Sequence, residues 1–140
     1  MTDDLFIDRK RRAALWFREL RDQIVFAFEQ VEDFHTEGPM SDRAAGRFEI
    51  RETSRSGPDG ADAGGGLMSV MRGGRVFEKV GVNVSEVYGP LGEQAQRSLT
   101  ARKEIPGLEA DPLFWSSGIL LVAHMQNPHV PAEHMNTRMF

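Results

Sequence analysis

Three polar side chains of different chemistry stand at every second position near the end of the sequence. They are His134, Asn136 and Arg138. If residues 133–140 form a β-strand, its alternation places all three on one face, about 6.8 Å apart. The opposite face then carries Met135, Thr137 and Met139. Arginine binds a carboxylate through paired N–H groups, asparagine orients it, and histidine moves a proton near neutral pH. The pattern therefore predicts a site for an acidic ligand, with a solvated sheet face as the alternative.

Two histidines fall on neighbouring predicted strands. His124 lies in the apolar strand at residues 119–125, and His134 lies in the strand that returns after a proline-punctuated loop. A hairpin brings the two imidazoles together across the paired strands. That arrangement suits a two-histidine metal site or an acid–base pair. The sequence contains no HExxH or similar ligand signature, so both alternatives stay open.

A long amphipathic helix is predicted at residues 4–35, because apolar residues recur at spacings of three and four. These residues are Trp16, Phe17, Leu20, Ile24, Ala27, Phe28, Val31 and Phe34. About 30 helical residues span roughly 45 Å, which is more than the width of a compact domain of this size. We expect the helix to lie across a structure larger than this chain. A second, shorter helix is permitted at residues 92–103, before a loop at 105–107.

The remaining elements predict an antiparallel sheet. Residues 48–53, 67–72 and 75–89 read as strands, with a hairpin turn at Gly73-Gly74. In the third strand Val76, Val80, Val82 and Val84 share a core-facing parity, and Phe77 takes the other face. Residues 54–66 read as turn and linker. The glycine run at 64–66 lacks the Lys-Ser/Thr of a phosphate-binding loop, so a loop or hairpin entry is predicted there.

These elements describe one α+β domain over residues 1–140, an antiparallel sheet flanked by helices. It comprises the helix at 4–35, a glycine-rich loop at 54–66 and a sheet at 67–140. The sequence ends at Phe140 in mid-strand, without a turn or polar tail. The last strand would then have an unpaired edge, which favours an incomplete part of a larger sheet.

Composition excludes several classes of protein. The chain has 17 Lys and Arg against 21 Asp and Glu, a net charge of −4, which argues against nucleic acid as a partner and against a polybasic membrane anchor. It has no cysteine, which excludes disulfides, thiolate metal sites and cysteine nucleophiles. No apolar run approaches the roughly 20 residues of a membrane span, and the start has no secretory h-region. We therefore expect a cytoplasmic protein.

Three stretches resemble the oxygen-dependent coproporphyrinogen III oxidase family. They are GGGLMSVMRGGRVFEKVGVNVSEVYG (64–89), FWSSGILLVAH (114–124) and NPHVPAEHMNTRMF (127–140). They follow one another in the family's order and spacing, after an amphipathic amino-terminal helix that the family also has. The resemblance covers nearly all of this chain but only about the first half of the family's length. It implies a large antiparallel sheet flanked by helices, in a homodimer.

The resemblance also implies roles for single residues. The family's His-x-Asn-x-Arg stretch matches residues 134–138. It makes His134 the proton donor, and Asn136, Thr137 and Arg138 the substrate-binding residues.

An upstream histidine of the family matches His124. The resemblance implies that His124 and His134 are ligands of a divalent metal, manganese or iron. The family usually has a substrate-contacting serine in the strand that leads to this histidine, where the present sequence has Leu120.

The implied reaction is oxidative decarboxylation of two propionate side chains of coproporphyrinogen III to vinyl groups. It yields protoporphyrinogen IX in heme and porphyrin biosynthesis, with molecular oxygen as co-substrate and no organic cofactor. A tetracarboxylate suits arginine and asparagine donors, and a flat macrocycle suits a broad sheet. Two alternatives remain: a non-catalytic tetrapyrrole-binding or interaction fragment that keeps the Asn136 and Arg138 site, and a small histidine metal protein.

Overall fold

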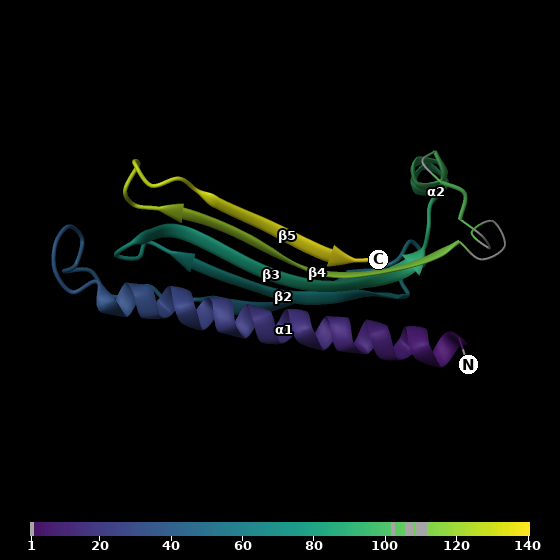
Figure 1. The fold of residues 1–140 in the computed structure, drawn as a ribbon, viewed down its shortest axis with the longest axis horizontal. Coiled ribbons are helices and arrows are strands. Elements are labelled where there is room, and N and C mark those ends of the chain that lie inside the picture. The colour runs from purple at the N-terminus through teal and green to yellow at the C-terminus, as the bar shows by residue number, and fades with distance from the viewer. Residues whose placement is uncertain (1, 102, 106–107, 109–111) are drawn as a thin grey trace.

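The molecule has two layers, a long helix and an antiparallel sheet (Figure 1). The structure is a computed structural model that describes residues 2–101, 103–105, 108 and 112–140. Its elements are α1 (Thr2–Phe34), β1 (Glu49–Ser56), β2 (Asp62–Arg72), β3 (Phe77–Pro90), α2 (Glu93–Thr100), β4 (Leu113–Met125) and β5 (Glu133–Met139). The strands pair in sequence order. The predicted α+β fold with a long amino-terminal helix is confirmed. The loop predicted at 105–107 lies largely outside the described residues.

Helix α1 runs along one face of the sheet over most of its length (Figure 1). Its apolar stripe packs on β3 and β4 through Phe17, Leu20, Ile24 and Phe28. Its 33 residues span about 50 Å, and the 14 residues of β3 span nearly as much. The long strands therefore accommodate the helix. The stripe is narrower than its periodicity predicts, because Phe34 and the other apolar residues at its margins are exposed: Trp16, Ala27 and Val31.

The core lies between α1 and the three central strands. Val80, Val82 and Val84 of β3 are buried there, as their shared parity predicts. Phe77 is buried with them, which corrects its predicted position on the opposite face. A register shift between Phe77 and Lys79 inserts one extra residue into β3, and such a bulge reverses the alternation locally. Phe77 consequently joins the core, whereas Lys79 lies on the face opposite Val80, as regular alternation predicts.

The glycine run does not form the predicted loop at 54–66. Gly64, Gly65 and Gly66 lie within β2, and only residues 57–61 connect β1 to β2. A Cβ on Gly65 would collide with the carbonyl oxygen of Thr53, and one on Gly66 with that of Val84. Glycine is required here because the backbones of three strands approach closely.

Strand β5 pairs with β4 along one edge only, and no described residue pairs with its other edge. Among the described residues, no helix combines the length and apolar character needed to cross a membrane.

Candidate functional site

The face of the sheet opposite α1, called here the open face, carries no helix over its middle in the described part of the chain; α2 stands at one end (Figure 1). Directly paired residues of antiparallel strands share a face, so the register divides the open face into transverse rows. Neighbouring strands lie about 4.8 Å apart and successive rows about 6.8 Å apart. Four of these rows carry most of the polar side chains, and each is named after one of its residues.

The Arg138 row crosses all five strands. It consists of Thr53, Gly66, Ser85, Gly118 and Arg138. The Asn136 row follows it along the strands. It consists of Arg51, Met68, Asn83, Leu120 and Asn136.

The His134 row is next and also crosses the whole sheet. It consists of Glu49, Val70, Gly81, Val122 and His134. The Lys79 row lies at the far end of the strands from the Arg138 row. It consists of Arg72, Lys79 and His124.

The guanidinium of Arg138 is held on the open face by hydroxyl groups. Its Nη1 donates to Ser116 Oγ at 3.0 Å, and its Nη2 lies 3.4 Å from Ser85 Oγ. Gly118 provides the room, because a Cβ there would lie 2.6 Å from Arg138 Cγ. Neither hydroxyl neutralises the positive charge, so the guanidinium keeps N–H groups and charge for an anionic ligand.

His134 and Asn136 occupy the positions on β5 that the alternation predicts. Both are exposed, and the register places them on the open face with Arg138. Thr137 pairs with Ile119, a core residue, so its side chain belongs to the α1 side of the sheet. Only the backbone of Thr137 can contact a ligand on the open face.

The two histidine rings approach each other as the predicted hairpin requires. The centroids of His124 and His134 are 5.9 Å apart, with the ring planes inclined by 47°. Lys79 is the direct partner of His124 on β3, so an ammonium group borders the pair.

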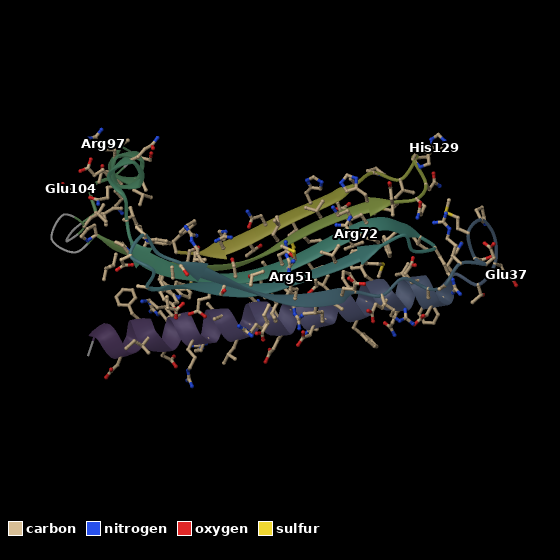
Figure 2. The ribbon with its side chains drawn as sticks, turned by 180° about the vertical axis from the view of Figure 1, so that it is seen from behind. Glu37, Arg51, Arg72, Arg97, Glu104 and His129 are labelled. Carbon is tan, nitrogen blue, oxygen red and sulfur yellow. The ribbon has the colours of Figure 1, made fainter. Side chains whose placement is uncertain are left out.

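Cations without carboxylate partners gather on the open face. In the described part of the chain, Arg51, Arg72, Lys79 and Arg138 form no ion pair. Glu49 is the only carboxylate in the four rows. Arg51 and Arg72 both stand on the sheet, at different distances along it (Figure 2). A chain with net charge −4 therefore presents one locally cationic face, which favours an anionic ligand there.

The middle of the open face lacks a side chain at Gly81. A Cβ on Gly81 would meet no atom within 4 Å, so this glycine leaves free space above the sheet. Beside it, Asn83 Oδ1 is buried and finds no hydrogen-bond donor among the described residues. A buried acceptor without a donor costs free energy.

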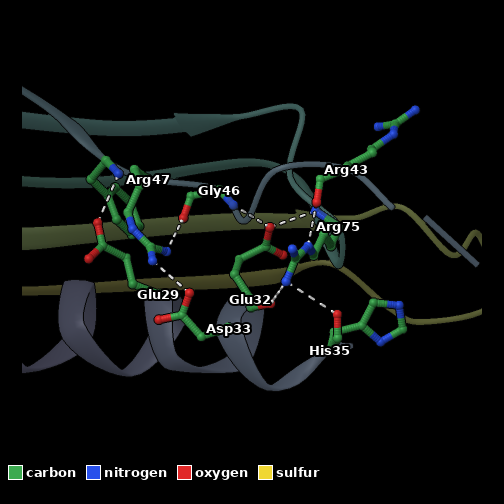
Figure 3. A network of polar contacts seen from close by, with 9 residues as sticks. Glu29, Glu32, Asp33, His35, Arg43, Gly46, Arg47 and Arg75 are labelled. Carbon is green, nitrogen blue, oxygen red and sulfur yellow. Dashed lines mark hydrogen bonds and ion pairs between the residues drawn. The ribbon is translucent and has the colours of Figure 1, made fainter. Parts of the chain in front are cut away.

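A buried carboxylate fixes the hairpin that carries the Lys79 row. The side chain of Glu32, near the end of α1, is fully buried and accepts four backbone N–H groups. Figure 3 shows the contacts to Gly46 and Arg75. Oε1 accepts from Gly46 at 2.8 Å and Arg75 at 2.5 Å, and Oε2 from Val76 at 2.6 Å and Phe77 at 3.2 Å. Burial by itself raises the pKa of Glu32, but these donors outweigh it and hold the pKa below the ordinary value.

Comparison with known proteins shows which family the sequence belongs to. Residues 12–140 match the family model described as coproporphyrinogen III oxidase. The chain belongs to this family. It is 41% identical over 132 residues to the oxygen-dependent coproporphyrinogen-III oxidase of Rickettsia felis, covering 94% of this chain and 42% of that protein. It is 43% identical over 123 residues to the enzyme of the same name from Rickettsia bellii, covering 88% of this chain and 39% of that protein.

The chain thus spans about two fifths of the length of the coproporphyrinogen oxidases that it matches. The three stretches on which the sequence resemblance rests supply β2, β3, β4 and β5, so the shared region includes the open face.

Leu120, where the sequence resemblance implies a serine in the family, lies in the Asn136 row between Asn83 and Asn136. Its side chain is 38% exposed, so it presents an apolar surface in the middle of the open face.

The two histidines do not by themselves make up the donor set of a metal centre. No cluster of three or more His, Cys, Asp or Glu side chains exists among the described residues. His124 faces the ammonium of Lys79, and Glu49 lies on β1 at the opposite edge of the sheet. Manganese and iron sites need further oxygen or nitrogen ligands. His124 and His134 therefore do not complete a metal site with other described residues.

Sequence reasoning did not find Ser85, Ser116 or Glu32. Both serines are conspicuous only once the register brings them to Arg138. Glu32 lies on the predicted charged face of its helix, and nothing local distinguishes it from its exposed neighbours.

Proposed function

We propose that the open face binds coproporphyrinogen III and that this chain takes part in its oxygen-dependent conversion to protoporphyrinogen IX. The observation that carries the proposal is the Arg138 guanidinium, held across Gly118 by Ser116 and Ser85 on a cationic sheet face. Membership of the coproporphyrinogen oxidase family supports the same substrate. A broad macrocycle with four carboxylates matches a broad sheet face that carries cations in separate rows.

The polar side chains on β5 have distinct roles in this proposal. Arg138 binds one propionate carboxylate through its remaining N–H groups. Asn136 donates its amide N–H to the substrate in the adjacent row. His134 is exposed beside them and gives or takes the proton that moves during the reaction.

The proposed chemistry removes carbon dioxide and a hydride equivalent from each of two propionates, which leaves two vinyl groups. In this proposal molecular oxygen accepts the electrons, which is consistent with the relatives being named oxygen-dependent oxidases. The residues of this chain bind and orient the substrate and move protons. The proposal requires no organic cofactor.

The test separates binding from turnover in the purified chain. Coproporphyrinogen III is prepared without air, then oxygen is admitted while oxygen uptake and protoporphyrin fluorescence are followed. Binding of the non-reacting coproporphyrin III is measured in parallel. Because a hydrogen bond to a charged group contributes about 1.5–3 kcal/mol, Arg138→Ala should weaken binding about 10- to 100-fold. His134→Gln should abolish product formation while leaving binding nearly unchanged.

The matched control is Arg9→Ala, which removes an exposed arginine of α1. It should alter neither binding nor turnover. Coproporphyrin binding that does not depend on Arg138 would contradict the proposal.

A second candidate function, tetrapyrrole binding without turnover, is favoured by Leu120 in the middle of the open face. In that case the same experiment gives Arg138-dependent binding and no oxygen uptake. Product formation by the chain would exclude this candidate.

A further inference from the structure

We propose that Arg72, Lys79 and His124, the Lys79 row, form a second carboxylate-binding site, at the opposite end of the open face from Arg138. This inference rests on the proposed function, because it names how the same face holds the other side of the substrate. It also assigns His124 to an anion site in place of a metal site.

The first support is that the fold places like charges side by side. Arg72 and Lys79 are direct cross-strand partners on β2 and β3, an arrangement that destabilises a sheet unless another group compensates. Lys79 lies on the open face because it alternates with the buried Val80 and Val82. The hairpin is fixed by Gly74 N–H, which donates to the Phe77 carbonyl at 2.9 Å.

The second support is that no described carboxylate forms an ion pair with these two cations. Arg72 and Lys79 are both exposed. Elsewhere Arg47 pairs with Asp33 at 2.6 Å, and Arg97 pairs with Glu93 at 3.8 Å. The charges of the Lys79 row are therefore open to an anion from solution.

The third support is the chemistry of the donors. Arginine and lysine have N–H donors and no acceptor, and histidine offers an N–H in either protonation state. The positive charges of Arg72 and Lys79, in the same row as His124, repel a metal cation. The row thus favours a carboxylate over a divalent metal, even though the rings of His124 and His134 are 5.9 Å apart.

The spacing suits a ligand with acidic groups on opposite sides. His124 lies six positions along β4 from Gly118, the partner of Arg138, which is about 20 Å of backbone. The distance between the charged groups is shorter than this backbone distance if the long arginine and lysine side chains extend toward each other. The His134 row is adjacent to the Lys79 row, about 6.8 Å away. A propionate held by the Lys79 row therefore lies closer to His134 than one held by Arg138.

The test uses the full chain and the double variant Arg72→Met and Lys79→Met, which keeps two unbranched side chains but removes both charges. Affinity for coproporphyrin III should fall about 10-fold or more, and its dependence on salt should weaken. Affinity for protoporphyrin IX, with two carboxylates on neighbouring rings, should change less than about threefold, since Arg138 alone can hold that edge. Arg9→Met on α1 is the matched control.

The outcomes of this test are separable from those of the proposed function. If the native chain binds coproporphyrin through Arg138 and the double variant binds equally well, the second site is wrong and the proposed function stands. If the native chain binds no porphyrin, the proposed function fails. Thermal stabilisation by succinate that requires Arg72 and Lys79 would still support the anion site, and stabilisation unchanged in the variant would overturn it. Stoichiometric binding of Mn²⁺ in equilibrium dialysis, abolished by His124→Ala, would also overturn it.

Discussion

The side chain of Arg138 passes directly over Gly118, its partner on the neighbouring strand. A Cβ at position 118 would lie 2.6 Å from Arg138 Cγ and 2.6 Å from the Thr137 carbonyl oxygen. The missing side chain of the glycine thus determines where the guanidinium lies, and with it the position of the anion-binding group nearest β5.

Gly118→Ala should therefore displace Arg138. We expect coproporphyrin affinity to fall about 10-fold, with a loss of about 1–3 kcal/mol in stability from overpacking. Gly81→Ala is the control, because its Cβ meets nothing within 4 Å; it should retain binding and fold at least as stably. Titration of ligand fluorescence and urea unfolding measure the two effects. Equal binding by both variants would mean that Arg138 does not depend on Gly118.

The free space above Gly81 leads to a second prediction. Gly81→Leu should unfold at nearly the native temperature, because the added side chain points into open space. It should nevertheless weaken coproporphyrin binding at least about 10-fold, since a bulky group in the His134 row separates a flat ligand from the sheet. Melting curves and binding titrations of the same preparation decide the matter. Native affinity in this variant would show that the ligand does not lie across the middle of the open face.

Leu120→Ser should supply the hydroxyl group that the sequence resemblance implies at this position. Since Leu120 is 38% exposed, the loss of stability should be small. One added hydrogen bond contributes about 0.5–1.5 kcal/mol, or about 2- to 12-fold in affinity. The same change at Leu113, which is 59% exposed at the start of β4, serves as the control and should not improve binding. An affinity that stays constant or falls would argue against a substrate contact at position 120.

The Glu32 carboxylate should control the stability of the helix-to-hairpin junction. Glu32→Gln leaves backbone N–H groups near Oε2 facing an amide that cannot accept from them. Each donor without an acceptor costs about 1–3 kcal/mol, so we expect a loss of about 2–4 kcal/mol in the free energy of unfolding at pH 7. The control is Glu19→Gln, an exposed carboxylate of α1, which should change it little. Urea unfolding measures the difference, and equal stability of the two variants would contradict the role assigned to Glu32.

The same carboxylate predicts a pH dependence. The pKa of Glu32 in the folded state lies below the ordinary value of 4.5. Its stabilising contribution is therefore fully present above pH 4.5 and is lost as the pH falls through the lower folded value. The stability difference between the native chain and Glu32→Gln should shrink as unfolding is repeated from pH 7 down to acid conditions. If the stability difference between the two proteins increased on acidification, the pKa of Glu32 would be raised in the folded state and not lowered.

The sequence predicted the elements whose signals are local. The apolar spacing in α1 and the alternation in β5 depend on residues within a few positions of one another, so the helix and the face shared by His134, Asn136 and Arg138 followed from the sequence. Gly73-Gly74 predicted its hairpin for the same reason. Strand alternation also placed Thr137 on the other face, where the register with Ile119 confirms it.

The errors arose where distant backbone decided the outcome. Gly64 to Gly66 looked like a loop, but neighbouring strands approach them so closely that no Cβ fits. Phe77 was assigned to the wrong face because a bulge is a mismatch between two strands and has no signature in one of them.

The sequence by itself thus determined the helix, the strands and the polar face of β5, because each depends on local periodicity. Only the tertiary structure decided which residues complete the site. The β3–β4–β5 register brings Ser85 and Ser116 to Arg138, and the bulge turns Phe77 into the core. Packing of α1 on the hairpin converts Glu32 from one more charged helix residue into a buried acceptor of four N–H groups. Such contacts join residues far apart in the chain, so their geometry exists only after folding.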